Sequence, residues 1–199
     1  PEPGFVMYKQ IARSLDLRYQ GVPLLADSFE LDMPTMLRII ETEQPALIFL
    51  AYPNNPTGNL FDAEAIKYLL SIAEGLIVVD EAYAPFTDSS FIHELPHHHN
   101  LLVMRTLSKL GLAGLRLGFL AGPPPLIEQL NKIRLPYNIN CLTQATASFA
   151  LQHSQFLLEQ TRHIRQQRAE VMTRLNALDG IQTYPSEANF ILIRTECKA

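Results

Sequence analysis

Short runs of consecutive apolar residues, separated by amphipathic stretches, restrict the fold of this chain more than any other feature of its sequence. An apolar run of about four to eight residues without polar alternation is typical of a strand buried on both faces, as in a parallel sheet. Such runs occupy residues 46–51, 76–79 and 101–104, with a fourth candidate at 117–121. Apolar residues recur at helical spacing in the stretches 8–17, 34–43 and 62–74. This alternation predicts an α/β fold, with a mostly parallel sheet flanked by helices.

The C-terminal part of the chain has a different pattern. Residues 143–178 are expected to be mostly helical, with a long helix whose apolar residues share one side. Gly180 is expected to end this helix, and the apolar residues 190–193 to start a new strand, so a second domain should begin near Gly180. The arginines of the helix lie largely off its apolar side and are expected to face solvent: Arg162, Arg165, Arg168 and Arg174.

Composition and charge exclude several classes of protein. Of the 199 residues, 47% are hydrophobic and 18% charged, which is typical of a globular chain and not of a disordered one. The net charge of −4 gives no basic surface for nucleic acid or an anionic membrane. No apolar run is long enough to span a bilayer, and residues 1–20 lack the pattern of a secretory signal. A cytoplasmic enzyme is therefore the expected class.

Cysteine and histidine give no sign of a metal site. Cys141 and Cys197 are far apart and have no metal-type spacing, so they are expected to be ordinary thiols. The adjacent histidines 97–99 follow Pro96 without a carboxylate or cysteine at ligand spacing, and an exposed loop is the expected structure. We therefore predict no metal site.

Polar residues follow each of the predicted strands. Asn55 comes after the first, Asp80 and Tyr83 after the second, and residues 106–109 after the third. Ligands of open α/β sheets bind at the carboxyl ends of the strands, so these side chains should meet at one crevice. Taken alone, Asp80 could equally be a helix cap or an ion-pair partner, and Lys109 a surface residue. A lysine held in a cleft can instead act as an amine nucleophile.

Linked motifs identify a family. The sequences Asn-Asn-Pro-Thr-Gly at 54–58, Val-Asp-Glu-Ala-Tyr at 79–83 and Arg-Thr-Leu-Ser-Lys at 105–109 resemble those of class I/II aminotransferases of pyridoxal-phosphate (PLP) fold type I. The segment 111–118, rich in glycine, belongs to the same resemblance. Together with residues 3–8 and 185–190, these motifs are most similar to those of the histidinol-phosphate aminotransferase branch. The resemblance covers essentially the whole chain in the family's order.

The resemblance implies a catalytic role for three residues. Lys109 would bond covalently to the PLP aldehyde and, once released, move a proton at the substrate α-carbon. Asp80 would pair with the protonated nitrogen of the cofactor ring and keep the ring an electron sink. Tyr83 would hydrogen-bond the phenolic oxygen of PLP.

The resemblance implies cofactor binding for further residues. Asn55 would join Tyr83 at the phenolic oxygen. Thr106, Ser108 and Arg116 would hold the phosphate group, and Phe5 would stack on the pyridine ring. Alternatives from the residues alone stay open for two of them: Phe5 could be an ordinary core residue, and Thr106 a strand-end hydroxyl that bonds the backbone.

The resemblance also implies domains and a reaction. Residues 1–155 would be the PLP-binding large domain, incomplete at its N-terminus, and 156–199 a linking helix with the start of a smaller α+β domain. A complete homodimeric enzyme would transfer an amino group from histidinol phosphate to 2-oxoglutarate in histidine biosynthesis. The alternatives are a threonine-phosphate decarboxylase, an aromatic aminotransferase, or an inactive truncated PLP-binding fragment. Because the family's N-terminal arm and its substrate-gripping arginine have no counterpart here, we expect a partial sequence.

Overall fold

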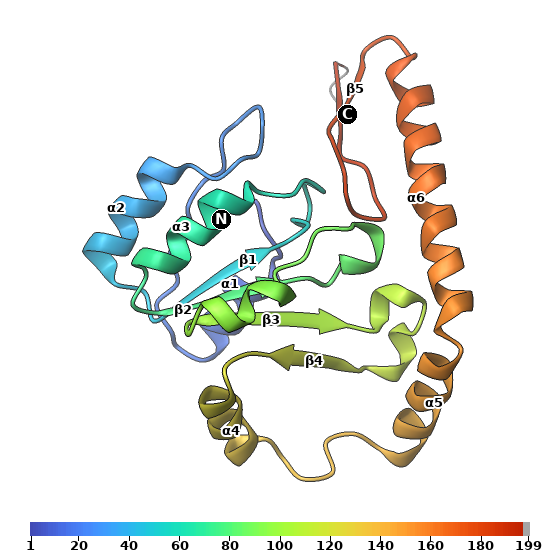
Figure 1. The fold of residues 1–199 in the computed structure, drawn as a ribbon. Helices are drawn as coiled ribbons and strands as arrows, with labels where there is room; N and C mark the ends of the chain where they lie inside the picture. Colours follow the sequence, from blue (N-terminus) through green and yellow to red (C-terminus); the bar gives the residue numbers. More distant parts are fainter. Residues whose placement is uncertain (197–199) are drawn as a thin grey trace.

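The computed structural model describes residues 1–196 and is built around one mixed sheet (Figure 1). Its strands are β1 (Leu47–Ala51), β2 (Leu76–Asp80), β3 (Leu101–Thr106) and β4 (Gly118–Ala121), in the order β1-β2-β3-β4. β1, β2 and β3 run parallel, and β4 pairs antiparallel with β3. The mostly parallel sheet is confirmed, and so is the fourth strand, whose direction the sequence did not predict.

The helices of the N-terminal half follow the predicted pattern. They are α1 (Met7–Ser14), α2 (Met33–Glu43) and α3 (Ala63–Ile72). Asp32 accepts the Thr35 backbone N–H at 3.3 Å, which satisfies one free donor of the first turn of α2. Asp62 caps α3 in the same way through Glu64.

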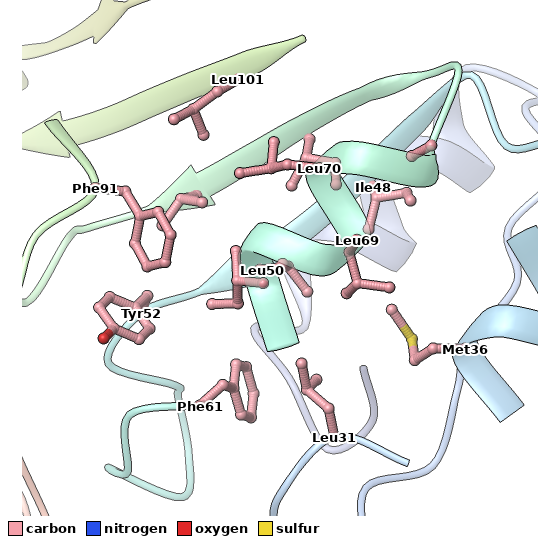
Figure 2. Packing of buried hydrophobic residues seen from close by; sticks show 14 of the residues in the cluster. Leu31, Met36, Ile48, Leu50, Tyr52, Phe61, Leu69, Leu70, Phe91 and Leu101 are labelled. Atoms are coloured by element: carbon pink, nitrogen blue, oxygen red, sulfur yellow. The ribbon is translucent and has the colours of Figure 1, made fainter. Parts of the chain in front are cut away.

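One face of the sheet forms the main core. Alternate strand residues such as Leu50, Val79 and Val103 are fully buried there, and α3 covers them with Ile66, Leu69 and Leu70 (Figure 2). Side chains alternate along a strand, so the intervening residues Phe49, Val78, Asp80 and Met104 point to the opposite face. α1 lies on that second face, where the Tyr8 ring stacks on Phe49.

The C-terminal half differs from the sequence prediction in several places. The predicted helical region 143–178 is two helices, α5 (Cys141–Gln152) and α6 (Ser154–Asn176), divided at His153. α4 (Pro124–Ile133) was not predicted, because its prolines look like turn residues although the first turn of a helix tolerates proline. The strand expected at 190–193 begins only at Ile193, as β6 (Ile193–Thr195), which pairs with β5 (Ile181–Thr183). Short 3-10 helices complete the chain: η1 (Ala84–Phe86), η2 (Ile92–His97), η3 (Ser108–Leu110) and η4 (Ala113–Leu115).

Two of the α6 arginines do not simply face solvent, as the sequence had suggested. Arg168 donates to the Ala188 carbonyl at 2.7 Å and the Phe86 carbonyl at 3.3 Å, and pairs with Glu187. Arg165 makes a two-pronged ion pair with Asp88. The prediction was wrong for these two because their partners lie far away in sequence and carry no helical signal. Arg162 and Arg174 are exposed, as expected.

Other expectations have simple outcomes. Within residues 1–196, no helix is long and apolar enough to cross a membrane, and no group of three potential metal-binding side chains occurs. Cys141 is an exposed free thiol, whereas Cys197 lies outside the described residues. His97 ends η2, while His98 and His99 continue in the loop that leads to β3. The domain boundaries predicted near residues 155 and 180 stay predictions.

The packing of α3 on the sheet can be tested with neighbouring residues. Leu69 is 0% exposed, so Leu69→Ala should lower the free energy of unfolding by about 2–5 kcal/mol through lost burial and the cavity left behind. Tyr68 on the same helix is 52% exposed, and Tyr68→Ala should cost much less. Urea unfolding followed by circular dichroism measures both. Equal losses for the two variants would contradict this account of the core.

Candidate active site

A cavity of about 640 Å³ opens at the carboxyl ends of β1, β2 and β3. The parallel register brings these ends level, with Ala51 opposite Asp80 and Asp80 opposite Met104. Every site residue predicted from the sequence lines this cavity: Phe5, Asn55, Asp80, Tyr83, Thr106, Ser108, Lys109 and Arg116. The expected convergence of strand ends on one crevice is confirmed, while the roles of the individual residues stay predictions.

Asp80 is a buried carboxylate at the end of β2, with a relative exposure of 7%. The Tyr8 hydroxyl donates to its Oδ2 at 2.6 Å, and the Ala82 backbone N–H donates to its Oδ1 at 3.0 Å. Burial raises the pKa of Asp80 above its ordinary value, and these two hydrogen bonds oppose the rise. Among residues 1–196 no cation lies within ion-pair distance of Asp80, so neutral donors alone compensate for its burial.

Asn55 and Tyr83 are coupled to each other. The Asn55 Nδ2 donates to the Tyr83 hydroxyl at 3.0 Å, although the two residues belong to loops after different strands. The Tyr83 ring is buried and packs edge-on against Phe190 at 5.1 Å between centroids. The Lys109 Nζ lies 5.0 Å from the centroid of the same ring, within cation–π distance. Lys109 is partly buried in the cavity wall, which argues against its being a freely solvated surface residue.

Hydrogen-bond donors gather where β3 leaves the sheet. Thr106 Oγ1 accepts the Ser108 backbone N–H at 3.1 Å and lies 2.9 Å from Ser108 Oγ, so this hydroxyl does bond backbone as one alternative proposed. Arg116 follows η4 with φ of 51°, a left-handed conformation that costs a non-glycine residue about 1–2 kcal/mol. Its exposed guanidinium borders the same cavity. Hydroxyls and a guanidinium together suit an oxyanion such as phosphate.

The N-terminal segment supplies an aromatic wall. Phe5 is 40% exposed and lines the cavity, so the alternative that it is an ordinary core residue is excluded. Tyr8 also lines the cavity, and sequence analysis missed it. Its nearness in sequence to Phe5 is the signal that could have placed it at the cavity, because the turn that leads into α1, closed by the Tyr8 N–H on the Phe5 carbonyl at 3.2 Å, brings the two rings together.

Behind Asp80, the next residue forms a buried ion pair on the opposite face of the sheet. The Glu81 side chain is fully buried and pairs with Arg105 at 2.7 Å. Its carboxylate also accepts from Ser90 Oγ at 3.0 Å and from the Phe91 backbone N–H at 2.5 Å. This network joins β2, β3 and the loop before η2, and therefore fixes the two strand ends that carry Asp80 and Thr106.

Loss of this ion pair should destabilise the fold strongly. We expect Glu81→Ala to lower the free energy of unfolding by about 3 kcal/mol, since it leaves the half-buried Arg105 charge without its partner. Asp88→Ala removes a carboxylate that is 85% exposed and also pairs with an arginine, so it should leave the unfolding midpoint nearly unchanged. Denaturant unfolding of both variants is the measurement. A small effect of Glu81→Ala would refute the role of the network.

The burial of Asp80 also predicts a pH dependence of stability. Its pKa in the folded state lies above that in the unfolded chain, which is about 4. Above the folded pKa the ionised carboxylate therefore lowers stability, and this cost vanishes as the pH falls through the folded pKa toward the unfolded one. Without added ligand, Asp80→Asn should be at least as stable as the unaltered protein at pH 7, and its advantage should shrink on acidification. Unfolding curves across this pH range test the sign, and an advantage that grows with acid would contradict it.

Comparisons with known proteins find relatives that match nearly the whole chain. Histidinol-phosphate aminotransferase 2 of Nitrosococcus oceani is 56% identical over 195 residues, covering 98% of this chain and 54% of its own length. Histidinol-phosphate aminotransferase 2 of Cupriavidus pinatubonensis is 52% identical over 199 residues, again covering 54% of its own length. The chain thus spans about half the length of these curated relatives.

A solved structure shares the fold. The histidinol-phosphate aminotransferase of Sinorhizobium meliloti, solved in complex with pyridoxal-5'-phosphate, superposes with a TM-score of 0.87 at 28% identity, covering 98% of this chain and 54% of that one. This confirms the predicted fold, that of the fold type I PLP-dependent transferases. The family model for aminotransferase class I and II matches residues 1–199. By its sequence, its fold and the residues around its cavity, the chain belongs to the class I and II aminotransferases.

Proposed function

We propose that this chain forms the cofactor-binding part of a PLP-dependent aminotransferase, with Lys109 as the residue that bonds to the cofactor. One observation carries the proposal: a lysine amine, a buried carboxylate and an Asn–Tyr pair line one cavity at the carboxyl ends of the strands. These groups are chemically different, and they come from the carboxyl ends of three separate strands or from the loops that follow them. A merely structural role for each would not require them to meet at one cavity.

The chemistry of the cavity fits PLP. Thr106, Ser108 and Arg116 offer hydroxyl and guanidinium donors for a phosphate group. Asp80 offers a buried carboxylate acceptor for a protonated ring nitrogen, and its own hydrogen bonds come from neutral donors. Phe5 presents an exposed aromatic ring on which a pyridine ring can stack.

The residues that line the cavity would have separate roles in transamination. PLP, when bound, supplies an electron sink for the carbanion that forms when the substrate loses its α-proton. Asp80 would hold the proton on the ring nitrogen, and Asn55 and Tyr83 would donate to the phenolic oxygen. Lys109 would hold the aldehyde carbon and, as a free amine, would move the proton at the substrate α-carbon.

For the substrates we propose histidinol phosphate and 2-oxoglutarate, converted to imidazole-acetol phosphate and glutamate in histidine biosynthesis. The support is the name of the relatives at 52–56% identity, which cover nearly the whole chain. The transfer balances because the amino group of histidinol phosphate becomes that of glutamate, while the keto group moves the other way. We assign the enzyme to the cytoplasm, since amino-acid biosynthesis takes place there.

The proposal includes a homodimer. A run of strongly exposed apolar side chains extends from the end of α4 to the start of α5: Ile133, Leu135, Tyr137 and Leu142, all at least 75% exposed. Exposed apolar clusters of this kind mark interaction surfaces in soluble proteins, and a second copy of the chain is the partner that the family suggests.

The role of Lys109 has a direct test. Full-length protein incubated with PLP and then reduced with borohydride should carry the cofactor covalently on Lys109, located by mass spectrometry of the peptide. Lys109→Ala should abolish labelling and transamination. The matched control is Lys132→Ala on the exposed side of α4, which should keep both. Labelling that persists in Lys109→Ala would refute the assignment.

The substrate has a separate test. The same protein, mixed with histidinol phosphate and 2-oxoglutarate, should form glutamate, whereas threonine phosphate should release no carbon dioxide and aromatic amino acids should react slowly. Release of carbon dioxide or a preference for an aromatic amino acid would replace the proposed substrate but keep the PLP chemistry. A protein that binds PLP yet transfers no amino group would be an inactive binding fragment.

A further inference from the structure

Tyr8 makes the shortest contact to the central carboxylate of the cavity. Its hydroxyl donates to Asp80 Oδ2 at 2.6 Å, although the two residues are 72 positions apart in the chain. Tyr8 belongs to α1 and Asp80 to the end of β2, so the bond joins the N-terminal segment to the sheet. Hydrogen bonds to a charged acceptor are about twice as strong as those between neutral groups.

Aromatic packing fixes the position of the Tyr8 hydroxyl. On one side the ring stacks on Phe49 with centroids 4.6 Å apart and planes at 20°. On the other side Phe5 meets it edge-on at 5.5 Å and 82°. These two contacts leave the ring little freedom to rotate, so the hydroxyl points to Asp80 without further ordering cost.

The Tyr8 bond also determines how the carboxylate is held. Each oxygen of Asp80 has a donor of its own, Tyr8 for Oδ2 and the Ala82 N–H for Oδ1, which fixes the plane of the group. Tyr8 is the strongest influence that opposes the rise in the pKa of Asp80 caused by burial. Burial together with the Asp80 charge raises the pKa of Tyr8 itself, so Tyr8 stays protonated and stays a donor.

The other charged and titratable groups near this pair cannot replace Tyr8. Glu81 raises the pKa of Asp80 and therefore acts against ionisation. Tyr19 and Tyr83 influence Tyr8 only through space. Lys109 and Arg116 line the same cavity, but neither forms an ion pair with Asp80 among the described residues.

We propose that Tyr8 is a positioning residue that keeps Asp80 ionised and turned toward the cavity, so that Asp80 can hold a proton on the nitrogen of the cofactor ring. This inference rests on the proposed function, because it assumes that the cavity binds PLP. It adds to that function a residue of α1 that acts through Asp80 and needs no contact with the cofactor.

The test uses Tyr8→Phe, which keeps the ring and its stacking and removes only the hydroxyl. Full-length protein is loaded with PLP labelled with nitrogen-15 in the ring, and the ring nitrogen is observed by NMR. In Tyr8→Phe the resonance should move toward that of an unprotonated pyridine, since the proton shifts toward a less stabilised carboxylate. The affinity for PLP should fall about tenfold, as expected for loss of one hydrogen bond to a charged group.

The matched control is Tyr52→Phe. Tyr52 is also buried, but its ring packs against Phe91 on the opposite face of the sheet, away from the Asp80 carboxylate. Its backbone N–H donates to the Asp80 carbonyl at 2.8 Å, and Tyr52→Phe leaves this bond in place. This variant should leave the nitrogen resonance unchanged. A double-mutant cycle adds a second measurement: in an Asp80→Asn background, Tyr8→Phe should weaken PLP binding no further.

The outcomes are separable. An unchanged resonance in folded Tyr8→Phe, or a full additional loss of affinity in the Asp80→Asn background, would overturn the role of Tyr8 while the proposed function stands. Failure of the unaltered protein to bond PLP at Lys109 would overturn the proposed function, and this inference with it. If Tyr8→Phe fails to fold by circular dichroism, the hydroxyl serves the fold and the inference is wrong.

Discussion

Parallel pairing of β1, β2 and β3 is the constraint on which the rest of the structure depends. Parallel strands end at the same edge of a sheet, and the register that pairs Ala51 with Asp80 and Asp80 with Met104 makes these ends level. The loops that follow therefore leave the sheet side by side and enclose one cavity. β4 runs in the opposite direction and returns the chain from η4 along β3, which keeps Arg116 at the same edge.

Two neighbouring carboxylates show how one strand serves both stability and function. Successive residues of a strand point to opposite faces, so Asp80 faces the cavity and Glu81 the core side. Glu81 is matched by a guanidinium, a hydroxyl and a backbone N–H, and therefore strengthens the fold. Asp80 has only neutral donors, and its burial remains partly uncompensated. A cationic ligand group beside Asp80 would form the ion pair that no side chain of the described fold provides. This is suitable for a carboxylate that binds a ligand.

Sequence patterns predicted the sheet and the polar residues at its strand ends because both depend on local signals, whereas Phe5 was predicted only from the family resemblance. Apolar runs mark buried strands, and the polar residues that follow them must lie at the strand ends. The bond between Tyr8 and Asp80 escaped prediction because the two residues are distant in sequence, and no local pattern encodes such a contact. The same applies to Arg168, which binds carbonyls of two remote segments. The break between α5 and α6 at His153 was not predicted, because no proline or glycine marks it in the sequence.

The contact between Tyr8 and Asp80 also couples the order of α1 to the charge of the cavity. None of the residues of α1 is fully buried, and apolar residues such as Ile11 remain half exposed, so few contacts hold this helix to the sheet. Coupling between two equilibria is reciprocal. The free energy by which docked Tyr8 stabilises ionised Asp80 therefore equals that by which ionised Asp80 stabilises docked α1. A cationic ring nitrogen that favours the ionised carboxylate would accordingly hold α1, and with it the Phe5 wall of the cavity, in place.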